Sequence, residues 1–386
     1  MSRIYVLAIL LCAIAGSGLE AQQVRLEGAR FVGAAGCKSS GCHGGAGEKR
    51  SQYITWAAHD VHTRGYAILT NARSERIAAG LGLGQMQNGP PAATTSARCT
   101  VCHSPLQTVP PAQRVSNFDP AESVSCESCH GAAGTWLRGH TRPDWTYAMR
   151  VGAGMRDLKS IYVRANTCVA CHQNLDSDIV AAGHPTLTFE LQSQTVAEPR
   201  HWKDAPDTGM SAWLVGQAVA LRETSWWRTQ ATGGDAATAA AADGLAWLLT
   251  EATAADRSLP AIDASAAGAI QQQADALARR AALGQFSRET AARVLRRLAG
   301  LGSTFTDAGA PAREALYQRA LRLTLALVSL TTTNGPTGAH LRLGAELQRL
   351  QQDVASPVSF DAAQFAADMD QLRATLGPSV ASAGER

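Results

Sequence analysis

Four short motifs, each a pair of cysteines followed directly by a histidine, constrain this chain of 386 residues more than any other feature. They are Cys37-Lys-Ser-Ser-Gly-Cys42-His43, Cys99-Thr-Val-Cys102-His103, Cys126-Glu-Ser-Cys129-His130 and Cys168-Val-Ala-Cys171-His172. Three of them have the spacing C-x-x-C-H, which is the attachment signal for c-type haem. The first motif has two further residues between its cysteines. Each motif offers two thiols to the vinyl groups of a haem and an imidazole to its iron.

Other uses of paired cysteines fit this pattern less well. Zinc sites also contain C-x-x-C, but they need no histidine directly after every second cysteine. Disulfides suit an exported protein, but random pairing would not produce four Cys-His dipeptides. A redox-active C-x-x-C belongs near a βαβ pattern, which this sequence lacks. We therefore predict four covalently attached haem c groups, bound by Cys37, Cys42, Cys99, Cys102, Cys126, Cys129, Cys168 and Cys171, with His43, His103, His130 and His172 as proximal iron ligands.

The ninth cysteine, Cys12, lies in a predicted signal peptide. Residues 1–21 begin with a positive charge, are apolar from Ile4 to Ala15 and end in small residues. This is the pattern of a Sec-type secretory signal, and the apolar run is shorter than the roughly 20 residues that span a bilayer. We expect cleavage after Ala21 and a periplasmic or extracellular protein. An uncleaved membrane anchor is the alternative.

Six of the ten histidines lie outside the motifs: His59, His62, His140, His184, His201 and His340. Five of these six lie between residues 59 and 201, among the motifs. A set confined to this region fits distal ligands, which bind iron on the side opposite the proximal histidine. Two histidines on every iron leave no open position and favour electron transfer, whereas an open position permits binding or chemistry.

The motif order resembles the tetrahaem cytochrome c-554 family over residues 30–203. The resemblance is carried by Trp56, by Asp60-Val61-His62-Thr63-Arg64-Gly65-Tyr66-Ala67, by Cys126-Glu-Ser-Cys-His-Gly with Arg138-Gly139-His140, and by Ala181-Ala182-Gly183-His184-Pro185. It implies that His62, His140 and His184 are distal ligands and makes His201 a fourth candidate. His59 is the alternative to His62, or a propionate contact. The founding carrier of the family has one five-coordinate haem, and whether His59 or His201 fills that position here stays open.

From residue 206 onward the chain has no cysteine and is rich in alanine and leucine. Apolar residues recur at helical spacing, as in Leu316, Ala320, Leu323 and Leu327, in Leu343, Leu347, Leu350 and Val354, and in Phe365, Met369, Leu372 and Leu376. Ser287 is expected to cap a helix that begins at Arg288, and Gly377-Pro378 to end the last helix. We predict six or seven antiparallel helices packed as a bundle.

These patterns predict a mainly α chain. Its parts are a cleaved signal peptide over residues 1–21, a tetrahaem cytochrome c domain with few regular elements over 22–205, a helical domain over 206–379 and a loose tail over 380–386. Aromatic residues make up only 5% of the chain. Porphyrin is therefore expected to form much of the core of the first domain.

The predicted function is the relay of single electrons between redox protein donors and acceptors, through closely packed and mostly bis-histidine haems. We assign no catalytic residue, because an electron carrier needs none. One alternative is a haem enzyme that acts on a small nitrogen or sulfur compound at a five-coordinate haem. Another is a haem subunit of a filament or of a membrane-associated complex, assembled through the helical domain. The net charge of +3 is too small to indicate nucleic acid.

Overall fold

A computed structural model describes residues 28–48, 50–84, 89–115, 118–119, 121–202, 209–230, 234–284, 286–333 and 339–377. The predicted signal peptide with Cys12, the boundary at 205/206 and the tail 380–386 lie outside these residues. The described parts consist of α-helices, 3-10 turns and irregular segments, and contain no strand. An isolated β-bridge joins Phe31 to Arg114. The prediction of a mainly α fold is confirmed.

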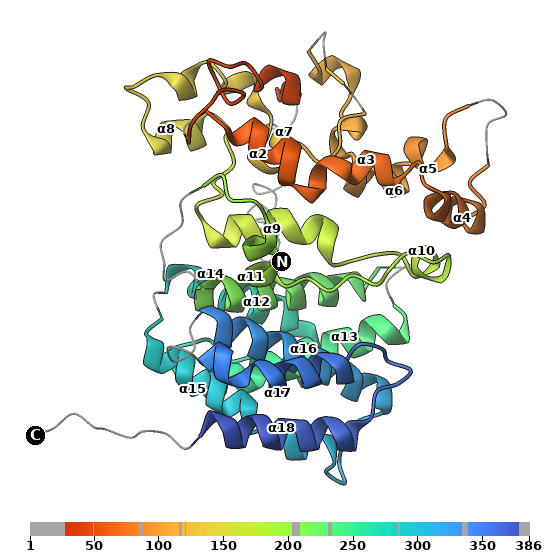
Figure 1. Ribbon diagram of the computed structural model, residues 1–386, viewed down its shortest axis with the longest axis vertical. Helices are drawn as coiled ribbons and strands as arrows, with labels where there is room; N and C mark the ends of the chain where they lie inside the picture. The colour runs from red at the N-terminus through yellow and green to blue at the C-terminus, as the bar shows by residue number, and fades with distance from the viewer. Residues whose placement is uncertain are drawn as a thin grey trace, which may run out of the picture. The chain divides into compact units, whose positions relative to one another are not determined.

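The chain divides by compactness into two units (Figure 1). The first unit comprises Met1–Glu75 and Leu83–Leu158, and the second comprises Arg76–Gly82 and Lys159–Arg386. Three of the Cys-His motifs therefore belong to the first unit, and the fourth belongs to the second. The predicted domain boundary at 205/206 follows the change in composition, and it stays a prediction.

The first unit has short helices and a small core. Its helices are α2 (Gln52–His59), α3 (Gly65–Ile68), α5 (Ala92–Thr95), α6 (Ala97–His103), α7 (Cys126–His130) and α8 (Tyr147–Gly152), while α4 (Ala72–Gly80) runs across the division between the units. Its hydrophobic cluster has Val32, Ala133 and Trp136 as buried members. Protein packing alone therefore buries little apolar surface in this unit.

The second unit combines long and short helices around one large core. They are α9 (Ile161–His172), α10 (Ser177–Ala181), α11 (Leu191–Ala197), α12 (Gly209–Trp227), α13 (Ala236–Ala254), α14 (Ile270–Leu283), α15 (Arg288–Ala299), α16 (Arg313–Thr333), α17 (Ala339–Asp353) and α18 (Ala362–Leu376). Helix α12 is buried on nearly every side and packs against α9, α11, α13, α14 and α16. Helices α16, α17 and α18 lie side by side (Figure 1).

Local signals at the ends of two helices are confirmed. The Ser287 hydroxyl accepts a hydrogen bond from the backbone N–H of Thr290, at 3.2 Å, and so caps α15. Helix α18 ends at Leu376, followed by Gly377 with φ of 76°, a left-handed conformation that favours glycine. Of the residues predicted to face the core at helical spacing, all except the half-buried Leu376 are buried.

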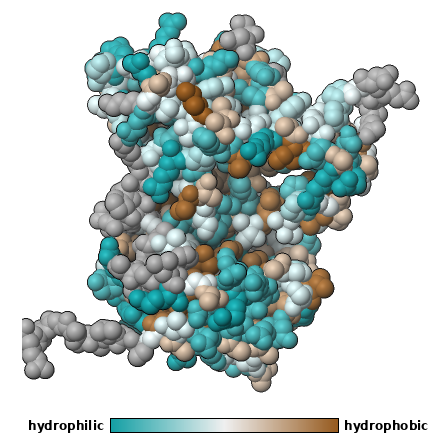
Figure 2. Space-filling model, viewed as in Figure 1, coloured by the Kyte–Doolittle hydropathy of each residue, from teal (hydrophilic) through white to brown (hydrophobic). Residues whose placement is uncertain are grey.

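Among the described helices, none is both long and apolar enough to cross a membrane. The face of the helical unit drawn in Figure 2 mixes hydrophilic residues with separate hydrophobic ones. The long helices of the second unit are thus built to bury their apolar faces against one another.

Candidate haem-attachment sites

The three regular motifs lie at the ends of helices. Helices α6, α7 and α9 end at His103, His130 and His172 respectively, each the last residue of a motif. Residues three and four positions apart share one face of a helix. The second cysteine and the histidine of each motif therefore project on the same side as the first cysteine, as attachment to one haem requires.

A backbone hydrogen bond joins the histidine of the first motif to its first cysteine, despite the two extra residues between them. The N–H of His43 donates to the carbonyl oxygen of Cys37 at 3.2 Å. In an α-helix the same bond joins residues four positions apart. The extra residues fold into a loop in which the N–H of Gly44 donates to the carbonyl oxygen of Ser39 at 3.0 Å. A Cβ on Gly44 would lie 1.8 Å from the carbonyl oxygen of Lys38, so this loop requires glycine there.

No disulfide joins the motif cysteines in the part of the chain that the structure describes. The thiols of Cys37 in the first motif and Cys126 in the third influence each other's ionisation. This interaction, together with burial, raises the pKa of Cys37, and the same interaction lowers the pKa of Cys126. The first and third motifs are therefore neighbours in the first unit.

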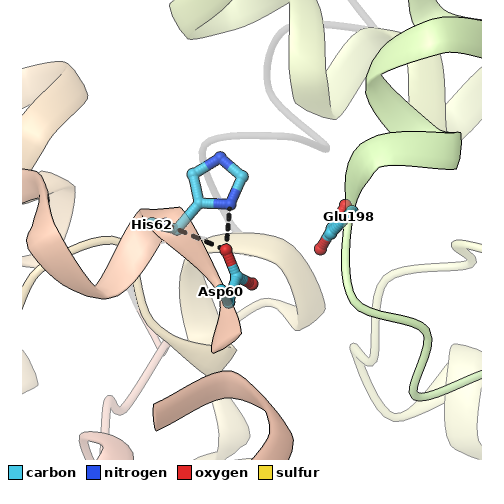
Figure 3. Close-up of side chains that lie close together, drawn as sticks. All are labelled: Asp60, His62 and Glu198. Carbon is cyan, nitrogen blue, oxygen red and sulfur yellow. Dashed lines mark hydrogen bonds and ion pairs between the residues drawn. The ribbon is translucent and has the colours of Figure 1, made fainter. Parts of the chain in front are cut away.

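His62 has the hydrogen bonding expected of an iron ligand (Figure 3). Its Nδ1 lies 2.9 Å from Oδ1 of Asp60, and the same oxygen accepts the backbone N–H of His62 at 2.9 Å. Because an ionised carboxylate only accepts hydrogen bonds, Nδ1 is the donor and Nε2 carries the lone pair. Metal-binding histidines characteristically donate their second ring N–H in this way. Asp60 is buried, so the orientation of the ring is fixed.

The other candidate distal histidines share this arrangement. Nδ1 of His140 is bonded to the carbonyl oxygen of Leu137, Nδ1 of His184 lies 2.8 Å from that of Pro185, and Nδ1 of His201 lies 3.3 Å from that of Pro199. A carbonyl oxygen is likewise only an acceptor, so Nε2 carries the lone pair in each ring. Among the proximal histidines, Nδ1 of His43 bonds to Oε1 of Gln52 at 2.9 Å.

The two remaining histidines differ from this group. His59 is exposed, and within the described residues its ring forms no hydrogen bond. The side chain of His340 lies outside what the structure describes. The hydrogen bonding of the first unit thus favours His62 over His59 as a ligand.

Two candidate ligands of the first unit lie close together. The ring centroids of His43 and His140 are 6.1 Å apart, with planes 18° from parallel. This stacked contact brings a proximal and a candidate distal histidine together within the first unit. The ring of Trp136 packs against that of His140 in a T-shaped contact, with 5.4 Å between the ring centroids.

Residues 36–131 match the family model of cytochrome c554 and c-prime. Over this segment the chain is similar to the cytochrome c554 family, and the similarity supports a c-type cytochrome that binds haem c covalently. No curated protein and no solved structure matches the chain in the two other comparisons.

The c554 match begins just before Cys37 and ends just after His130, so it spans the first three motifs and His62. The fourth motif and the histidines at 140, 184 and 201 lie beyond the matched residues. Their assignment rests on the C-x-x-C-H pattern and on the hydrogen bonds described above.

Glu127, between the two cysteines of the third motif, is a residue whose role the sequence did not reveal. Its carboxylate is buried and accepts backbone N–H bonds from Val32 at 3.0 Å, Gly33 at 2.7 Å and Ala133 at 2.6 Å. Burial raises the pKa of this carboxyl, and the backbone donors oppose that effect. Glu127 thereby ties the third motif to the segment that leads into Cys37.

The segment that carries His62 packs directly on the second motif. A Cβ on Gly65 would lie 2.5 Å from the carbonyl oxygen of His103, so only glycine permits this approach. The N–H of Tyr66 donates to the hydroxyl of Ser123 at 3.0 Å, and that hydroxyl donates to the carbonyl oxygen of Thr63 at 2.7 Å. The turn beginning at His62 is therefore held on both sides.

The first unit also exposes apolar side chains that a bound cofactor would cover. Large apolar side chains beside the motifs are exposed, including Val61 next to His62 and Val101 inside the second motif. A porphyrin attached at each motif would cover such side chains and enlarge the small protein core. The donor set and the apolar surroundings of the first unit thus fit haem c.

The fourth motif is embedded in the core of the helical unit. Ile161, Ala165 and Val169, one face of α9, are buried in that core. On the polar side, the hydroxyl of Tyr162 donates to Asp275 of α14 at 2.6 Å, and Arg222 of α12 donates to the same carboxylate at 2.6 Å. A helix with a haem motif at its end is therefore docked on two longer helices.

Proposed function

We propose that this protein is an exported tetrahaem c-type cytochrome that relays single electrons between redox partner proteins. In this proposal each of the four motifs holds one haem c through its two cysteines, and His43, His103, His130 and His172 are the proximal ligands. The distal ligands are His62, His140, His184 and His201. When bound, haem c supplies a reversible one-electron couple at its iron.

The observation that carries this proposal is the shared hydrogen bonding of the four distal candidates. In each ring Nδ1 donates to a carboxylate or carbonyl oxygen, which leaves the lone pair on Nε2. A second imidazole on every iron would leave no position for a substrate, so the residues support electron transfer rather than chemistry on a bound molecule.

We further propose that His140 is the distal partner of His43. Their proximity, with ring centroids 6.1 Å apart in a stacked contact, supports this pairing, and the Nδ1 contacts with Gln52 and Leu137 leave Nε2 of each ring for the iron. In this pairing the stretched first motif binds its haem as the regular motifs do.

Export and domain roles complete the proposal. The sequence pattern of residues 1–21 supports cleavage after Ala21 and a periplasmic or extracellular location. Residues 22–205 would carry the four haems, and the helical residues 206–379 would hold the fourth motif in place. The partners would be redox protein donors and acceptors, reached directly or within an oligomer or a membrane-associated complex.

Electron paramagnetic resonance of the oxidised holoprotein tests the proposal. We expect only low-spin ferric signals, unchanged by cyanide or nitric oxide. The variant His140→Met should alter one low-spin signal, while the matched control His59→Met should alter none. A high-spin signal that shifts with added cyanide would instead indicate an open iron position and a haem enzyme.

A further inference from the structure

A chain of hydrogen bonds connects the middle of α16 to the end of α9. Nη1 of Arg322 donates to the carbonyl oxygen of Phe189 at 2.9 Å. The N–H of Phe189 donates to Oε1 of Gln173 at 3.1 Å, and Nε2 of Gln173 donates to the hydroxyl of Thr224 in α12 at 2.7 Å. Gln173 directly follows His172, the histidine of the fourth motif. Arg322 is thus linked to the fourth motif through two residues.

Arg322 is an unusual residue to find at this place. Its side chain is buried, only 2% exposed, in the core of the helical unit. Burial lowers the pKa of its guanidinium to about 10, against the opposing charge of Glu190, so the group remains protonated at neutral pH. A buried charge is costly unless it is paired and fully hydrogen-bonded.

The pairing of Arg322 is incomplete. Glu190 is also buried, and its carboxylate accepts the N–H of Ser193 at the start of α11. Within the described residues, however, neither Nε of Arg322 nor Oε1 of Glu190 has a hydrogen-bond partner. A hydrophobic residue of similar size would avoid this cost. A buried, incompletely paired charge of this kind is weak evidence for stability, which makes Arg322 a candidate for a functional role.

We propose that Arg322 is a positioning residue for the fourth haem site: it fixes the end of α9 through Phe189 and Gln173, and its buried charge raises the reduction potential of the haem held there. This inference rests on the proposed function, because it requires a haem at Cys168 and Cys171. Reduction adds a negative charge, which a fixed positive charge stabilises most where the surroundings are apolar. Burial and nearby charge are established determinants of haem potentials.

The test compares matched variants of the holoprotein in a spectroelectrochemical redox titration. Arg322→Met removes both the charge and the hydrogen bond at similar volume, whereas Arg322→Lys keeps the charge. Arg319→Met is the control, because Arg319 lies one turn away on α16 and pairs instead with Asp243. We expect R322M to lower the reduction equilibrium constant of one haem about tenfold, or about 59 mV for one electron. R322K should retain most of the wild-type potential, and R319M all of it.

Two further measurements distinguish a failure of the proposed function from a failure of the role proposed for Arg322. The component that shifts in R322M should be the one missing from a Cys168→Ala/Cys171→Ala variant. If the wild-type protein lacks that component, the proposed function fails at the fourth motif. If it has four haems and R322M leaves every potential unchanged, or R322K shifts as much as R322M, the role of Arg322 is overturned.

A variant that keeps Arg322 covers the case in which R322M does not fold. Gln173→Leu breaks the chain of hydrogen bonds while the buried charge stays in place. We expect it to change the low-spin resonance of the same haem, because the end of α9 loses its anchor to Phe189 and Thr224. An unchanged resonance in Q173L contradicts the positioning role directly.

Discussion

Glu127 is the residue on which the structure makes its sharpest stability prediction. Its carboxylate is 2% exposed and receives the backbone N–H groups of Val32, Gly33 and Ala133. In Glu127→Ala all three donors lose their acceptor in a buried place. An unsatisfied buried donor costs about 1–3 kcal/mol, so we expect the free energy of unfolding to fall by about 3 kcal/mol or more.

The amide variant should have an intermediate effect. Glu127→Gln keeps one oxygen that accepts hydrogen bonds. Its NH₂ group replaces the other oxygen, is itself a donor and cannot accept a backbone N–H. The N–H of Val32 bonds both oxygens, whereas Gly33 bonds Oε2 and Ala133 bonds Oε1, so whichever oxygen is replaced, one N–H is left without an acceptor. The expected loss is about 1–3 kcal/mol.

Guanidinium unfolding of the purified holoprotein, followed by haem absorbance and by circular dichroism, measures both losses. With a slope of about 3 kcal/mol per M, the midpoint for Glu127→Ala should fall by about 1 M. Glu75→Gln, at an exposed position of the same unit, is the control and should leave the midpoint unchanged. Midpoints of both Glu127 variants within experimental error of wild type would refute the role of the buried carboxylate.

Three other perturbations have defined outcomes. Gly44→Ala should reduce the haem content by one per chain, measured as pyridine haemochrome, because its Cβ has no room; Gly41→Ala, with open space around it, should retain full content. Asp60→Asn should raise the equilibrium constant for reduction of one haem several-fold, and with it that haem's potential, because a negative charge beside a ligand is lost. Burial and neighbouring carboxylates raise the pKa of Asp353 to about 6, so its folded form holds a proton more tightly than the unfolded chain and its stabilising effect is lost as pH rises from about 4 through 6. Asp353→Asn should therefore raise the melting temperature more at pH 7.5 than at pH 4.5, whereas exposed Asp307→Asn should show no such trend.

The chemistry of the attachment motifs was readable from the sequence because it depends on covalent spacing. C-x-x-C-H fixes two thiols and an imidazole within one helical turn, and α6, α7 and α9 indeed end at the motif histidines. The long helices were equally predictable, since Leu316 to Leu327 and Leu343 to Val354 repeat at the period of a helix. The Ser287 cap follows from the same local rules.

Contacts between distant parts of the chain were not readable in this way. Nothing local to Glu127 indicates that it receives N–H groups from residues 32 and 33, and nothing near Gln173 points to Phe189. The Asp60–His62 contact was within reach of the sequence, because an acidic residue two positions before a ligand is well placed to accept from Nδ1. Long-range hydrogen bonds depend on tertiary packing, which a single sequence does not display.

Intact-mass spectrometry of the mature protein, purified from the exported fraction under denaturing conditions, tests the central claim most directly. The proposal predicts a chain that begins at Gln22 and carries the added mass of four covalently bound haem groups. A chain with fewer than four haems, or one whose motif cysteines are recovered as unmodified thiols or as disulfides, would contradict it.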